Sequence, residues 1–317
     1  MSGGIYVYLL RRLASAVPTL IGVSILAFVM ASMGTVDPAQ MLAGPAATRE
    51  TVESIRRELG LDQPLYVQYG RYVGRLLQGE FGRSYLTNAR VIDEIWAVFP
   101  YTVELVAVTI LLASAVGIPL GVLAAVRRGS LIDRLSMIVS MVGVSVPIFF
   151  TGLALIYIFA YKLGWFPISG RGGPLWTVDR LRHIFLPAVS LAGLVAGSIA
   201  RLTRASMLEV LSMDYVRTAR AKGASEWSVV LEHALRNALI PVVTIIGLQI
   251  GWLLGGAVVT QTVFAWPGLG RVSVNAILNR DLPILQGAVI LSATAYVLVN
   301  LVVDILYGVI NPRIRLE

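Results

Sequence analysis

The chain has 317 residues, of which 56% are hydrophobic and 14% are charged, and its formal net charge is +8. Soluble domains carry roughly 25% charged residues, so this composition excludes an ordinary soluble fold and predicts an all-α integral membrane protein. The positive charge does not indicate nucleic acid, because no basic face with interleaved aromatic residues stands apart from the membrane loops. Membrane topology and anionic lipid headgroups explain it better. The chain contains no cysteine, which excludes disulfides and thiolate metal sites.

Six apolar runs follow one another along the chain, each near the ~20 residues that cross the hydrocarbon of a bilayer. The first follows Arg11 and Arg12, as in a signal peptide, but its run of about 21 residues exceeds an h-region of roughly 7–15, so we expect an uncleaved helix. In the sixth, aliphatic residues outweigh the insertion cost of Asn300 and Asp304. We therefore predict six transmembrane helices, at 10–32, 101–126, 136–161, 184–203, 238–260 and 286–310.

The arginine and lysine residues of the short loops predict the orientation of the chain. With the amino terminus inside, thirteen basic residues are cytoplasmic: Arg11, Arg12, Arg127, Arg128, Arg134, Arg201, Arg204, Arg217, Arg220, Lys222, Arg236, Arg313 and Arg315. Six lie in the two short outer loops: Lys162, Arg171, Arg180, Arg182, Arg271 and Arg280. We expect both termini to face the cytoplasm.

The region 33–100 is the one sizeable segment expected outside the membrane on the opposite face. Val52, Ile55 and Leu59 recur at helical spacing, and Gly60 is placed to end that helix. A second apolar stripe follows, at Tyr69, Val73, Leu76 and Leu77. These patterns predict two short amphipathic helices on the outer face, and a contact surface for a soluble partner is compatible with them.

Three glycines at four-residue spacing, Gly247, Gly251 and Gly255, predict close backbone packing of the fifth span. The pattern is compatible with helix packing within this subunit and with an interface between two subunits. Two ionisable residues lie inside spans, where such groups are functional candidates. Glu104, one turn inside the outer end of the second span, is expected to reach water. Asp304 is expected to serve helix packing or hydrogen bonding.

The sequence also excludes several kinds of chemistry. Neither of its two lysines, Lys162 and Lys222, follows a glycine, so the chain has no phosphate-binding P-loop. Its two histidines, His183 and His233, fall at opposite membrane faces in this topology, which removes HExxH zinc sites and argues against a Ser–His protease. We therefore expect a non-catalytic chain that holds no cofactor or metal of its own.

The segment 204–237 is polar, basic and helical in pattern, and it lies between two spans. A helix from Met213 to Lys222 is expected to end at Gly223 in a left-handed conformation, and Ser225 can cap a second helix with Glu226 near its positive end. Most loops are only a handful of residues long. A connection of this size is therefore expected to dock a partner in the water phase.

The first of these two helices carries the basic charge of the segment. Arg217 and Arg220 share one face, and Lys222 closes the basic end. A surface helix lying on lipid headgroups is the alternative to a docking element. Because the chain has no ATP site of its own, the expected partner is a soluble motor that supplies the energy.

This segment resembles the "EAA" coupling loop of ABC-importer permeases, whose pattern is Glu-Ala-Ala, three residues, Gly, nine residues and Ile-x-Leu-Pro. Here Arg217-Thr218-Ala219 stands at Glu-Ala-Ala, Gly223 at the glycine, and His233, Leu235 and Arg236 at Ile, Leu and Pro. At the positions that depart from this general pattern, the sequence resembles the dipeptide/oligopeptide/nickel branch. That branch reads Arg-Thr-Ala-Arg-Ala-Lys-Gly and then His-x-Leu-Arg-Asn-Ala.

The resemblance extends along nearly the whole chain, and within that branch it is to the first of two permeases. Four further segments carry it: Gly60 to Tyr66, Phe264 to Arg271, Asn279 to Asp281 with Gln286, and Asn300 to Arg313 with its Asn311-Pro312-Arg313 ending.

The resemblance implies a type I ABC importer permease fold in the bacterial inner membrane, with 1–317 as a single domain and 204–237 as its cytoplasmic coupling loop. It implies three kinds of partner besides membrane lipid. These are a second homologous permease, two ATP-binding subunits that hold ATP and Mg, and an extracytoplasmic solute-binding protein. The implied coupling residues are Asp214, Arg217, Thr218, Ala219, Arg220, Lys222, Gly223, Ala224, Ser225 and Glu226. The substrate path is not assigned to residues.

The implied activity is ATP-driven import of dipeptides or oligopeptides. Nickel, glutathione or another small solute is the alternative, because in this branch the receptor largely selects the substrate. An ion-gradient-driven secondary transporter is the rival from another class. Such a transporter is expected to have charged residues at the membrane midplane or discontinuous helices in symmetric pairs. The sequence shows neither feature convincingly. A membrane enzyme lacks a catalytic constellation, and a purely structural scaffold does not account for the five family motifs.

Overall fold

A computed structural model of the protein describes residues 3–32, 37–44 and 46–310, and their main elements are helices. The Asn311-Pro312-Arg313 ending and Arg315 lie outside the described residues. Within these, five segments are long and apolar enough to cross a membrane. They are 14–32 of α1 (Gly3–Ser32), α5 (Val91–Val126), α8 (Val178–Leu211), Glu226–Gly256, and 282–305 of α14 (Leu282–Ile310). They correspond to all predicted spans except the third.

The third predicted span is bent rather than straight. It consists of α6 (Leu131–Ser145), α7 (Ile148–Leu155) and the π-helical turn η1 (Ile156–Lys162), and the two parts meet at 101°. The break falls at Val146-Pro147, where Val146 has extended backbone angles, φ −80° and ψ 128°. A residue before proline avoids the helical region, and proline supplies no N–H to continue the helix. Pro119, Pro187 and Pro241, by contrast, stay inside helices.

The core of the bundle forms where α5 and α8 run side by side and α11 (Arg236–Gly256) and α14 close over them. Leu105, Leu191, Val195 and Leu253 are fully buried there, together with Trp266 from the connection that follows α11. Such interiors are packed as tightly as organic crystals. The start of α8 and the turn of α5 around Glu104, which carry polar residues, are therefore held at fixed positions.

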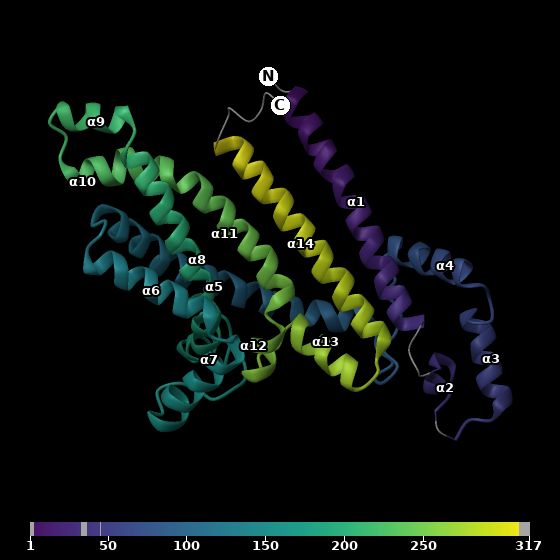
Figure 1. Ribbon diagram of the computed structural model, residues 1–317. Coiled ribbons are helices and arrows are strands. Elements are labelled where there is room, and N and C mark those ends of the chain that lie inside the picture. Colours follow the sequence, from purple (N-terminus) through teal and green to yellow (C-terminus); the bar gives the residue numbers. More distant parts are fainter. Residues whose placement is uncertain (1–2, 33–36, 45, 311–317) are drawn as a thin grey trace.

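The helices of the basic segment lie at one end of this bundle. They are α9 (Asp214–Ala221), the single turn α10 (Glu226–Ser228) and the π-helix η2 (Val229–Leu235), which runs directly into α11. Figure 1 shows them at the same end as the start of α1 and the end of α14. Two further short helices, α12 (Val258–Val263) and α13 (Leu269–Leu278), occupy the opposite end.

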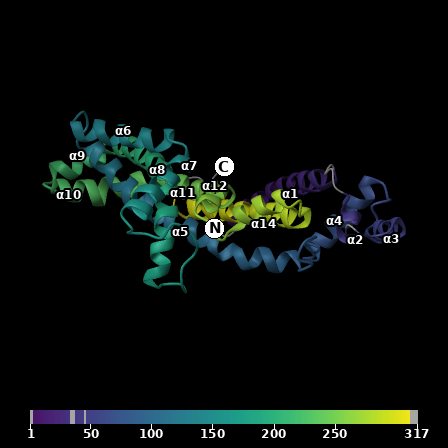
Figure 2. The same ribbon diagram turned by 90° about the horizontal axis from the view of Figure 1, so that it is seen from below.

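The region expected outside the membrane forms a separate group of short helices. They are α2 (Pro38–Ala43), α3 (Arg49–Leu59) and α4 (Leu65–Leu77), which lie to one side of the main body in Figure 2. Thr48 caps α3 by accepting a bond from the Thr51 amide, and Gly60 ends it in the left-handed region with φ 69°. The two predicted amphipathic helices are therefore confirmed as helices.

Candidate functional site

The basic segment folds as the local sequence predicts. Gly223 has φ +85°, and its amide donates to the Arg220 carbonyl at 2.9 Å as α9 ends. Ser225 then accepts a hydrogen bond from the Ser228 amide at 3.3 Å and caps α10. The left-handed conformation is costly for any residue with a Cβ, whereas glycine adopts it freely. Gly223 therefore sets the angle between the two short helices.

Two of the three cations in the stretch 214–226 have acidic partners within it. Arg220 forms a two-pronged ion pair with Glu226 across the Gly223 turn, with N–O distances of 2.9 and 3.3 Å. Arg217 lies 3.6 Å from Asp214 one helical turn earlier. Lys222 is thus the cation of this helix for which no ion pair is described. All these side chains are exposed, so the pairs add little stability but shape the surface.

The buried side of the segment attaches it to the transmembrane helices. Val216 of α9 packs with Val229 and Val230 against Met207 and Val210 at the end of α8. Ala219 and Ala224 are half-buried along the same side, while Thr218 and Ser225 are exposed. Trp227, on the side of the segment away from the bundle, is 73% exposed and was not among the predicted site residues. Tryptophan is enriched at binding interfaces, so a tryptophan next to α9 could have marked this position as a candidate site residue.

A polar contact also joins α9 to the start of α11. Asn237 donates to the Tyr215 hydroxyl at 2.7 Å and to the His233 carbonyl at 3.2 Å, and Tyr215 donates to the same carbonyl at 3.2 Å. His233 belongs to the π-helix η2, whose wider turns shift the carbonyl pattern, and such turns often mark functional positions. We call these three residues the Tyr215 clip. The sequence shows Asn237 only as part of a family pattern.

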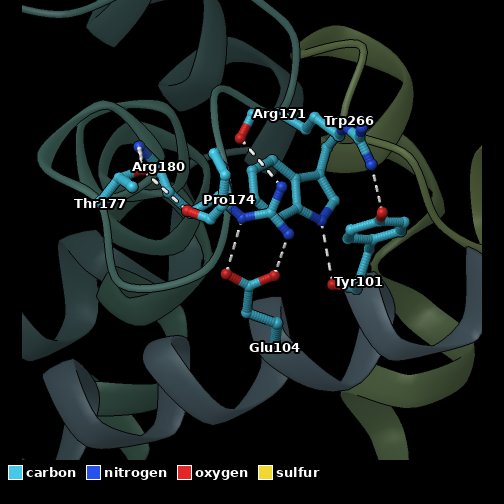
Figure 3. A network of polar contacts seen from close by, with 7 residues as sticks. All are labelled: Tyr101, Glu104, Arg171, Pro174, Thr177, Arg180 and Trp266. Carbon is cyan, nitrogen blue, oxygen red and sulfur yellow. Dashed lines mark hydrogen bonds and ion pairs between the residues drawn. The ribbon is translucent and has the colours of Figure 1, made fainter.

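The opposite end of the bundle contains a buried ion pair that the sequence analysis missed (Figure 3). Arg180 of α8 is only 2% exposed, and its guanidinium makes a two-pronged contact with the Glu104 carboxylate of α5, one prong being 2.9 Å long. Glu104 was expected to reach water, and its side chain is 18% exposed while its carboxylate pairs with Arg180. The signal was available as two opposite charges at the outer ends of the second and fourth predicted spans.

Aromatic rings and loop carbonyls surround this ion pair. The Arg180 guanidinium lies 4.8 Å from the ring centres of both Tyr101 and Trp266, close enough for cation–π attraction. Arg180 also donates to the Arg171 carbonyl at 3.0 Å, and Arg171 in turn donates to the Tyr101 hydroxyl. The network fastens the loop before α8 and the loop after α12 to a single turn of α5 (Figure 3).

The segment from Phe264 to Arg271 is held by hydrogen bonds against the same turn of α5. The Thr102 hydroxyl accepts from the Leu269 amide at 2.9 Å, and the buried Gln261 side chain accepts from the Gly270 amide at 2.8 Å. Trp266 donates from its indole to the Tyr101 carbonyl at 3.0 Å. These bonds satisfy backbone groups at the ends of short buried helices, as burial requires. They give a physical reason for the family pattern at this place.

Asp281 links the outer region to the turn before α14. Its carboxylate accepts from the Ser84 hydroxyl and from the Tyr85 amide, the latter at 3.2 Å. Burial, with the nearby charge of Asp281, raises the pKa of Tyr85 to about 12. The phenol, which is neutral at pH 7 in any case, therefore stays neutral to higher pH.

The three glycines of α11 do not behave alike. A Cβ at Gly247 would collide with Val303 of α14, and one at Gly251 would lie 2.9 Å from the Tyr296 ring of the same helix. A Cβ at Gly255 would meet no atom within 4 Å. Gly247 and Gly251 thus pack within this subunit, whereas Gly255 does not take part in that contact.

Asp304 lies on α14 at a pocket shared with α1. It lines a pocket of about 180 Å³ with Ser15, Thr19, Tyr296 and Asn300. Ser15 and Asp304 both take part in polar interactions, so the carboxylate is not isolated in the membrane interior. Its role in helix packing stays a prediction. Among the described residues, no group of three or more acidic, histidine or cysteine side chains could hold a metal ion.

Comparison with known proteins decides the family. Residues 117–316 match the family described as "Binding-protein-dependent transport system inner membrane component", and residues 5–106 match the corresponding N-terminal family. The chain belongs to this family of inner-membrane permeases. The resemblance to the dipeptide/oligopeptide/nickel branch is confirmed.

Curated relatives of this permease cover almost its whole length. The glutathione transport system permease proteins GsiC of Escherichia coli (strain K12) and Shigella dysenteriae serotype 1 (strain Sd197) are each 46% identical to it. Both matches extend over 308 residues, which is 97% of this chain and 98% of each relative.

Solved structures show the fold. The permease superposes on a chain of the inward-facing MetNI methionine ABC transporter with a TM-score of 0.57 and 19% identity, covering 69% of this chain and 95% of that one. The all-helical ABC importer permease fold predicted from the sequence is confirmed. The protein is a non-catalytic, multi-pass permease of the inner membrane, and it works with an ATPase and a binding protein.

Proposed function

We propose that this permease imports glutathione, a tripeptide, as one of two homologous permease subunits of an ATP-driven transporter. The observation that carries the proposal is the 46% identity over 97% of the chain to permeases of glutathione transport systems. That similarity favours glutathione, an alternative in the sequence analysis, over dipeptides and longer peptides, and over nickel. The permease does not select the substrate alone, because half of the path belongs to the second permease and a binding protein delivers the solute.

The coupling site is the surface formed by the predicted residues Asp214 to Glu226. Two ATP-binding subunits hold ATP and Mg, and each engages one coupling loop from the cytoplasm. The exposed polar face of α9, the exposed Trp227 and the buried attachment to α8 support this assignment. A helix that offers one face to a partner and packs the other on its own bundle can move with that bundle as a rigid unit.

Orientation follows from the same assignment. The start of α1 and the end of α14 lie at the end of the bundle that carries α9 and α10 (Figure 1). If the coupling helices are cytoplasmic, both termini face the cytoplasm, and the outer network around Arg180 faces the binding protein. The excess of arginine in the loops at the coupling end supports this orientation.

Transport follows from rigid-body motion of α8 and α11. When the ATPases close on ATP, they pull α9 and α10, and the attached helices turn the path from inward-facing to outward-facing. Binding protein then releases substrate into the open path. Release of the ATPases after hydrolysis returns the bundle to the inward-facing state and lets the substrate leave.

The transporter assembled with its partner subunits in proteoliposomes tests the proposal. Uptake of radiolabelled glutathione should require ATP and the binding protein, and should exceed uptake of a dipeptide or of nickel offered at equal concentration. An assembly whose ATPases cannot hydrolyse ATP is the control. Preferential dipeptide or nickel uptake would contradict the substrate, and uptake driven by a proton gradient without ATP would contradict the transport class.

A further inference from the structure

Helix α4 has an apolar flank that no described part of the chain covers. Tyr66 is 77% exposed and Leu77 is 84% exposed, on one side of a helix whose arginines, Arg71 and Arg75, lie on the other side. The two sides follow from the helical period of 3.6 residues, which places positions 66 and 77 about 20° apart and positions 71 and 75 about 40° apart.

The position of α4 against α1 sets its depth relative to the membrane. Tyr69 lies between these two sides and points at α1, where its hydroxyl is 2.9 Å from the Ser24 hydroxyl. The rings of Tyr69 and Tyr72 lie 5.4 and 5.8 Å from the ring of Phe28. These contacts attach α4 to the side of α1, not to its tip.

The residues that α4 contacts belong to the membrane-crossing part of α1, which ends at Ser32. At about 1.5 Å per residue, Phe28 and Ser24 lie roughly 6 and 12 Å from that end. Tyrosine side chains reach several ångströms from the helix axis, so α4 itself lies near the level of Phe28. A depth of about 6 Å inside the apolar segment falls within the roughly 5–10 Å at which interfacial helices bury their apolar face at the boundary between headgroups and acyl chains.

We propose that α4 is an interfacial helix whose apolar flank, formed by Tyr66 and Leu77, binds the outer-leaflet phospholipids of the membrane. The arginine flank then faces the phosphate and water layer, where guanidinium groups bind phosphates well. An amphipathic helix with aromatic and aliphatic residues on one face and arginines on the other is suited to this position. Through its contact with α1, α4 fixes the height of α2 and α3 above the bilayer.

The lack of cysteine in this chain allows a direct measurement of depth. Spin labels are placed by Leu77→Cys and by the matched neighbour Gln78→Cys, whose side chains are both exposed and point about 100° apart. The complete transporter is studied in phospholipid nanodiscs, and the same complex without the introduced cysteine gives the background. Collisions with oxygen report lipid exposure, and collisions with a water-soluble nickel chelate report water exposure.

The ratio of oxygen to chelate collisions should be several-fold higher for the Leu77 label than for the Gln78 label. A label from Tyr66→Cys should agree with the Leu77 label, which guards against a disturbance at one position. Equal chelate access at positions 77 and 78 would overturn the proposal. It would also be overturned if the Leu77 label is open to water and becomes shielded only when the binding protein is added, because the occupant is then that protein.

Discussion

Asn237 donates a hydrogen bond to the Tyr215 hydroxyl at 2.7 Å, and this contact joins α9, the proposed coupling helix, to the first turn of α11. The two residues are separated by 22 positions and by the Gly223 turn. Because both also bind the His233 carbonyl, the clip fixes the direction in which α9 leaves the bundle. A motion imposed on α9 is therefore passed to α11 through a defined contact.

Loss of the clip should reduce coupling more than assembly. Tyr215→Phe removes the hydroxyl and Asn237→Ala the amide, and each deletes hydrogen bonds worth about 0.5–1.5 kcal/mol. We expect transport per ATP hydrolysed to fall about 5-fold, with ATPase subunits still bound. Uptake and ATP hydrolysis measured in the same proteoliposomes check this.

Ser212→Ala is the control for the clip, because that hydroxyl bonds only the Glu209 carbonyl within its own helix end. It should leave the transport-to-hydrolysis ratio unchanged. Should Tyr215→Phe and Asn237→Ala also leave the ratio unchanged, the clip would be a structural contact without a role in coupling.

Substitution of Gly223 tests backbone strain separately from steric clash. A Cβ at this position meets no atom within 4 Å, so any defect arises from the φ of +85°. Gly223→Val should insert normally yet lose most uptake and most receptor-stimulated ATP hydrolysis, since a β-branched residue strongly disfavours this region. Gly223→Asn should retain much more activity, because asparagine tolerates left-handed angles. Equal activity of the two variants would contradict the argument.

The buried Arg180–Glu104 pair should be costly to break on one side only. Glu104→Ala leaves a guanidinium that is 2% exposed without its carboxylate, and removal of one partner of a buried pair costs about 3–5 kcal/mol. We expect a clear drop in the melting temperature of the solubilised transporter. The double change Glu104→Leu with Arg180→Leu should recover part of the loss. A double variant less stable than Glu104→Ala would show that the charges do not act as a pair.

The glycines of α11 provide a matched comparison on one helix. Gly247→Ala inserts a methyl against Val303 and should destabilise the protein by about 1–3 kcal/mol through overpacking. Gly255→Ala places the same methyl in open space and should be neutral or stabilising, because alanine favours the helix by about 1 kcal/mol over glycine. Thermal unfolding of both variants in one detergent checks this. A destabilising Gly255→Ala would point to a second subunit at that position.

The features that could be predicted from the sequence are those set by residues close in the chain. Five spans, the end of α9 at Gly223 and the Ser225 cap depend on composition and on local backbone preferences. The bend at Val146-Pro147 also has a local cause, yet proline occurs inside four other helices of this bundle. Proline chemistry alone therefore does not tell a kinked span from a broken one.

The pairing of distant residues was decided only by the tertiary structure. Glu104 and Arg180 are 76 positions apart, and nothing in either local sequence distinguishes an ion pair from two charges that reach water separately. The same holds for Gly255, whose spacing matches Gly247 but whose neighbours do not.

The sequence by itself determined that this chain crosses the membrane, cannot bind ATP through a P-loop, and presents a basic helix–turn–helix segment, because these properties depend on residue type and short spacing. The tertiary structure decided which charges meet, which glycines contact a helix, and how α9 is fastened to α11. Those outcomes depend on how packed helices are rotated and shifted relative to one another. The periodicity of a single helix does not specify these relationships.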